Sequence, residues 1–135
     1  MLGMTHGTRN ERNRIAKLAQ SAMAGLPEPF RSRAGAVQLR IADLPGHDML
    51  QELGLHDPMT LTGLYEGVPL THKSSSYPEL TPDTIWLFVR PIMAEWHARG
   101  DVELRDLVTN VVVHELAHFF GWDDDDIASI DRWWE

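Results

Sequence analysis

Residues 114–124 have the sequence HELAHFFGWDD, and this segment indicates more about the structure of the protein than any other. The segment contains an HExxH pattern, followed by a glycine and then by aspartates. On a helix, the two histidines of HExxH lie one turn apart on the same face, with the glutamate beside them. Two imidazoles at this spacing can bind one zinc ion, and the carboxylate can act on a water molecule there. The segment therefore predicts a helix, a metal and a hydrolytic reaction together.

The residues before the motif support a helix from about residue 101 to residue 120. Leucine and valine recur at helical spacings over 104–113. Asp101 is a candidate N-cap, and Gly121 is a candidate C-terminal stop. The three valines just before the motif also suit a strand, but strand geometry would place the two histidines about 13 Å apart. Because the helix is apolar nearly all round at its C-terminal end, we expect it to be central in the fold.

Four residues of this segment form the candidate site. His114 and His118 are the expected ligands of one zinc ion per chain. Glu115 lies about 100° round the helix from His114, so its carboxylate is placed as a general base that acts on water. Zinc needs a third protein ligand. Asp124 lies six residues after His118, at the position where the metzincin pattern has its third ligand.

The run of aspartates over 123–126 also has a purely structural interpretation. Four carboxylates suit the positive N-terminal end of a last helix, which we expect over 127–134. Asp123 or Asp124 could be the N-cap of that helix, and Asp123 and Asp125 are the alternative ligands to Asp124. The other five histidines show no mutual spacing that indicates a site: His6, His47, His56, His72 and His97.

The composition is typical of one globular domain. The chain has 135 residues, 43% of them hydrophobic, which is enough to bury a core without disulfides. Cysteine is absent, which excludes thiol catalysis and Cys-ligated zinc and fits a cytoplasmic protein. The net charge of −8 offers no basic surface for nucleic acid, and no apolar run is long enough to cross a membrane. We expect residues 1–9 to be a disordered tail before a domain over 10–135.

The remaining patterns predict a short sheet and several helices. The expected elements in chain order are a helix over 10–25, a strand over 37–41, a helix over 47–53, strands over 61–66 and 85–89, and helices over 91–98, 101–120 and 127–134. Serines and prolines over 74–82 indicate a loop. This order predicts the α+β class, in which a short sheet packs against the central HExxH helix and other helices.

With these segments in hand, the chain resembles the small zincin-like metallopeptidases of bacteria. These are minimal metalloprotease-like proteins with an HExxHxxGxxD pattern. The resemblance runs from about residue 26 to residue 134. The segments that carry it are LPEPFRSR at 26–33, GLYEGVPL at 63–70 and the block over 114–127, of which the last is the most specific.

The resemblance implies a zincin-like α+β fold and a role for each residue of the motif. It implies His114 and His118 as zinc ligands, Glu115 as the general base and Asp124 as the third ligand. The chain departs from the larger metzincins in one respect. Only 11 of the 135 residues follow Asp124, and none of them is methionine, so we do not expect the Met-turn that lies beneath the metal in those enzymes.

Three functional hypotheses follow from these residues. The first is a zinc-dependent metallopeptidase that acts on a peptide or protein, which would add as a strand to a sheet edge at 60–66. Tyr65 could then donate a hydrogen bond to the developing oxyanion, although a half-buried aromatic on a strand is the simpler role. The alternative is a zinc-binding regulatory or interaction module without peptidase activity, in which His47 or His72 closes the site. The third has no metal, and the helix serves only as core.

Overall fold

The computed structural model of the protein describes residues 2–67 and 82–121. The elements in chain order are α1 (Leu2–Ala24), α2 (Phe30–Ala34), β1 (Gln38–Ala42), α3 (His47–Leu53), the 3₁₀ helix η1 (Pro58–Thr60), β2 (Gly63–Glu66), β3 (Thr84–Phe88), α4 (Val89–Arg99) and α5 (Leu104–Phe120). The prediction of a small α+β domain with a short sheet and an HExxH helix is confirmed. The loop predicted over 74–82 and the helix predicted over 127–134 lie outside the described residues, except for Pro82.

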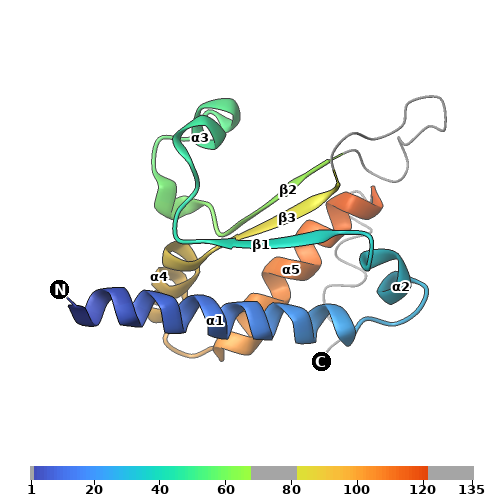
Figure 1. Ribbon diagram of the computed structural model, residues 1–135, viewed down its shortest axis with the longest axis horizontal. Helices are drawn as coiled ribbons and strands as arrows, with labels where there is room; N and C mark the ends of the chain where they lie inside the picture. Colours follow the sequence, from blue (N-terminus) through green and yellow to red (C-terminus); the bar gives the residue numbers. More distant parts are fainter. Residues whose placement is uncertain (1, 68–81, 122–135) are drawn as a thin grey trace.

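The three strands form a mixed sheet of order β1-β3-β2. Strand β1 runs parallel to β3, and β2 runs antiparallel to it. The central position of β3 explains its continuous apolar sequence, because Ile85, Leu87 and Phe88 are fully buried. Figure 1 shows α1, α4 and α5 together on one side of this sheet. Within the described residues, β2 is an edge strand, and it contacts α5.

Helix α5 is the centre of the hydrophobic core. Eleven of its 17 residues are buried, so the helix is surrounded on most of its circumference. It packs against α1, where Ile15 and Ala19 are fully buried, and against β2 and β3. This packing leaves only a narrow exposed face on α5, and the histidines of the motif lie on that face. No helix in the described part of the chain is long and apolar enough to cross a membrane.

The prediction for α5 is correct at its C-terminal end and wrong at its N-terminal end. Gly121 ends the helix as expected, in the left-handed conformation with φ 78°. The N-cap is Glu103 and not Asp101, so the helix starts three residues later than predicted. The reason lies in the turn after α4. Gly100 ends α4 at φ 74°, and the indole N–H of Trp96 donates to the carbonyl of Val102 at 2.8 Å, which holds this turn out of the helix.

The first helix differs from the prediction at its start. Helix α1 begins at Leu2, whereas the sequence predicted a disordered tail over 1–9 and a helix from residue 10. No proline interrupts residues 2–10, and a helix that is already formed extends at little cost because nucleation is the expensive step. The helix ends at Ala24, close to the predicted end. The division into a tail and a domain over 10–135 stays a prediction.

The sequence analysis did not predict the short helices α2 and η1, because hydrogen bonds from side chains start them and they show no hydrophobic periodicity. Before α2, the carboxylate of Glu28 accepts hydrogen bonds from the N–H and the hydroxyl of Ser32 at 3.0 and 2.8 Å. Before η1, the carboxylate of Asp57 accepts a hydrogen bond from the N–H of Met59 at 2.9 Å. Such local bonds start helices that are too short to show an apolar repeat.

Candidate metal centre

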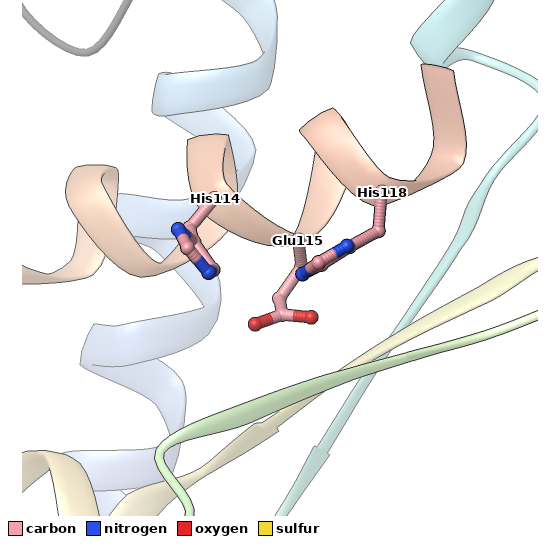
Figure 2. A group of neighbouring side chains, drawn as sticks. All are labelled: His114, Glu115 and His118. Atoms are coloured by element: carbon pink, nitrogen blue, oxygen red, sulfur yellow. The ribbon is translucent and has the colours of Figure 1, made fainter. Parts of the chain in front are cut away.

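Helix α5 brings His114, Glu115 and His118 together. Their candidate ligand atoms all lie within 4.8 Å of one another. The two imidazole centroids are 5.2 Å apart, with the rings at 84°. Figure 2 shows both rings and the carboxylate of Glu115 on the side of α5 that faces the sheet. Two ligand atoms that bind the same zinc ion lie at most about 4.2 Å apart, so small side-chain rotations let this group hold one ion.

The exposure of these three side chains separates them from the rest of the helix. His114 and His118 are exposed and Glu115 is half-buried, whereas most other residues of this turn are buried. Core histidines would be buried and bonded to the backbone. Exposed imidazoles on successive turns leave room for an ion and for a substrate, as an open metal site requires.

The electrostatics of Glu115 suit a proton acceptor. Burial raises the pKa of its carboxyl above the ordinary value. The charges of His118 and His114, and a hydrogen bond from the main-chain N–H of Tyr65, offset only part of that rise. A carboxylate with a raised proton affinity accepts a proton more readily, which is the property that a general base needs.

The register of the sheet explains why Tyr65 reaches Glu115. The N–H of Phe88 donates to the carbonyl of Thr62 at 3.0 Å, so this pair is a hydrogen-bonded pair of the antiparallel ladder. Such pairs alternate along a strand. Gly63 and Tyr65 therefore turn their main-chain groups away from β3. The hydrogen bond from the N–H of Tyr65 to Glu115 agrees with this alternation and ties the edge strand to the HExxH helix.

Gly63 allows β2 to lie close to α5. A Cβ at this position would be 2.7 Å from Cγ1 of Val111 and 3.3 Å from Cγ of Glu115. A glycine inside a strand is a signal of close backbone approach, and this is the one sequence feature that could have pointed to the contact. Sequence reasoning identified the strand but not the role of its glycine.

The hydroxyl of Tyr65 has a structural partner. It donates to the carboxylate of Asp83 at 3.0 Å, and Asp83 is only 4% exposed. The ring packs edge-on against Phe119 of α5, with centroids 6.0 Å apart. These contacts match the half-buried structural role that the sequence analysis gave as the simpler one. The role of this hydroxyl at an oxyanion stays a prediction.

A cavity of about 160 Å³ opens beside the motif. Helices α4 and α5 and the chain just before β2 contribute its walls. Its lining residues are Thr62, Glu95, Leu107, Asn110, Val111, His114 and Glu115. Of these, the sequence analysis had given only His114 and Glu115 a role in the site, because no spacing connects Glu95 to the motif before the helices are packed.

The predicted third ligand, Asp124, lies outside the described residues, as do its alternatives Asp123 and Asp125 and the histidine at 72. Within the residues that the structure describes, His114, Glu115 and His118 are the group of this kind that could hold a metal. His47, in α3, is not part of it. The third ligand therefore stays a prediction.

The fold and the site define a class of protein: a small α+β domain whose HExxH helix presents two histidines and a glutamate beside the edge of a sheet. The sequence model of the zincin-like metallopeptidase family matches residues 34–134. The chain belongs to this family, and the resemblance found in the sequence is confirmed. No curated protein sequence matches the chain.

Proposed function

We propose that this protein is a zinc-dependent metallopeptidase that hydrolyses a peptide bond of a peptide or protein substrate. The observation that carries the proposal is the position of Glu115. Its carboxylate lies with two exposed histidines on one helix and receives a hydrogen bond from the edge strand. Membership of the zincin-like metallopeptidase family supports the same activity.

Three side chains would hold the metal. His114 and His118 offer ring nitrogens, and Asp124 would add a carboxylate oxygen, a donor set that zinc accepts. A bound zinc ion supplies Lewis acidity, which polarises the scissile carbonyl and makes water a stronger nucleophile. We expect one zinc ion per chain.

The chain itself supplies the proton transfers and the alignment. Glu115 accepts a proton from the attacking water on a carboxylate oxygen and later delivers it to the leaving amine. The N–H of Tyr65 holds that carboxylate in place. We further propose that an extended peptide adds to the edge of the sheet at 60–66, where Gly63 turns its main-chain groups away from β3.

The first experiment measures bound zinc in purified wild type, His118→Ala and Asp124→Ala. We expect about one zinc ion per chain in wild type, a loss in His118→Ala and a weaker affinity in Asp124→Ala. His97→Ala is the control, because this exposed histidine of α4 lies outside the group and its loss should leave the zinc content unchanged. A wild type that takes up no zinc when zinc is offered would refute the metal site.

The second experiment separates hydrolysis from metal binding. Glu115→Gln should keep its zinc and lose peptide cleavage by a factor of about 10² to 10⁴, because the substitution removes only the proton acceptor. Cleavage at the wild-type rate by this variant would remove Glu115 from the mechanism. Full zinc occupancy without cleavage of any peptide by wild type would favour a zinc-binding regulatory or interaction module.

A further inference from the structure

The cavity beside the motif has the size of a subsite for one side chain. Its volume is about 160 Å³, which is less than the roughly 300–1,000 Å³ of pockets that enclose a whole small molecule. From His114 its wall continues back along α5 through Val111, Asn110 and Leu107, which covers two helical turns. A side chain of a bound peptide that enters this cavity would therefore lie next to the reacting bond.

The walls of the cavity combine apolar and anionic groups. Leu107 and Val111 are buried residues of the core and provide an aliphatic wall. Asn110 adds a polar amide, and Glu95 of α4 adds a carboxylate. Neither lysine nor arginine lines the cavity among the residues that the structure describes. Lysine and arginine side chains carry a cationic head on a methylene stem, and this combination of walls complements both parts.

Glu95 already pairs with a guanidinium on its own helix. The Nε of Arg99 lies 3.3 Å from Oε2 of Glu95, and the two side chains are 49% and 38% exposed. Exposed pairs at this helical spacing contribute little to stability, so a cation of the substrate can replace Arg99 without a large loss. The pair also shows that the carboxylate of Glu95 is accessible to a cationic group.

We propose that this cavity binds the side chain of a lysine or arginine next to the scissile bond, and that Glu95 selects it. The location of this subsite rests on the proposed peptidase function. Glu95 is not part of the metal group and lines the cavity, so we assign it a role in specificity and not in the reaction. Its effect is on which peptide binds, and peptide binding can be measured without turnover.

The test uses two labelled peptides that differ at one position, lysine in one and norleucine in the other. Norleucine keeps an unbranched aliphatic stem but has no ammonium group. Binding is measured by fluorescence anisotropy on zinc-loaded Glu115→Gln protein, which should not cleave the peptides. We expect the lysine peptide to bind about fivefold more tightly, the upper range for a half-exposed ion pair.

Three further substitutions in this background identify the source of the preference. Glu95→Gln should abolish it, because the amide has a similar shape and no charge. Glu52→Gln, at an exposed glutamate of α3, makes the same change in net charge and should leave the preference intact. Arg99→Gln should strengthen lysine binding, because it removes the competing cation. A purely structural role of Glu95 would not predict that Glu95→Gln and Arg99→Gln change the binding of the lysine peptide in opposite directions.

The outcomes distinguish this inference from the proposed function. Equal affinity for both peptides, binding of neither peptide, or a preference that survives Glu95→Gln would overturn the inference, whereas cleavage by wild type would still support the peptidase. A lysine preference that depends on Glu95, together with absence of cleavage of any peptide by wild type, would support binding of a cationic side chain in this cavity and refute the peptidase.

Discussion

Replacing Gly63 by alanine tests how closely β2 must approach the HExxH helix. The added Cβ would lie 2.7 Å from Cγ1 of Val111, 3.2 Å from the carbonyl oxygen of Trp86 and 3.3 Å from Cγ of Glu115. Carbon atoms prefer a separation of about 3.5–4.0 Å, and the β-branched side chain of Val111 has few other rotamers on a helix. Because β2 then has to move away from α5, we expect a loss of about 1–3 kcal/mol in unfolding free energy, as for other overpacked sites.

The same movement should affect cleavage more than metal binding. It lengthens the hydrogen bond from the N–H of Tyr65 to Glu115, whereas both histidines stay on α5. We therefore expect Gly63→Ala to lower the urea midpoint and peptide cleavage and to keep most of the bound zinc. Gly46→Ala is the matched control, because a Cβ there meets no atom within 4 Å and the backbone φ of −70° suits any residue. Its unfolding free energy should change by less than about 0.5 kcal/mol.

A second substitution shows whether the clash with Val111 is the cause. Val111→Ala removes the atom that the new Cβ would meet, so the double variant should be more stable than the sum of the two single effects predicts. Residues in contact show coupling energies of about 0.5–3 kcal/mol. A Gly63→Ala protein with the wild-type midpoint and wild-type cleavage, or a double variant with simply additive losses, would refute a tight contact between β2 and α5.

Two other substitutions test contacts near the site and at α2. Tyr65→Phe removes the hydroxyl that donates to the buried Asp83, so the unfolding free energy in urea should fall by about 1–2 kcal/mol with zinc content unchanged. A midpoint equal to that of wild type would contradict this. Hydrogen bonds from Ser32 and the charge of Arg31 hold the pKa of Glu28 below its ordinary value of 4.5. Its stabilising contribution is therefore complete above that value and lost as the pH falls through the lower, folded pKa. Glu28→Gln should unfold more easily than wild type at pH 7 in urea, and a difference that persists at low pH would contradict this reasoning.

The sequence predicted an element well where the residue pattern itself restricts the backbone geometry. The spacing of His114 and His118 excludes a strand if both bind one ion, so the helix could be predicted in spite of three β-branched valines. Helix α3 matches its predicted bounds because Gly54 ends it in the left-handed conformation, with φ 69°. The predicted start of α5 was wrong because the turn at Gly100, which ends α4, and the indole of Trp96 in α4 decide where α5 begins.

The parts of the site that the sequence did not predict depend on packing between distant segments. The N–H of Tyr65 meets Glu115 only because β2 pairs with β3 in one register and α5 lies against both. Glu95 enters the cavity only when α4 lies beside α5. Neither relation leaves a periodic signal in a single sequence, since each is set by which faces of two elements meet. Gly63 is the exception, because a glycine in a strand already indicates close approach.

The packing that stabilises this small domain also prepares its proposed base. Helix α5 buries most of its surface between α1 and the sheet, and His114 and His118 lie on the narrow face that stays exposed. Glu115 lies at the border between these two surfaces, and burial against β2 raises the pKa of its carboxyl. A Glu115 turned fully to solvent would lose this rise and would be a weaker proton acceptor near neutral pH. The close contact at Gly63 therefore connects the stability of the fold to the reactivity of its site.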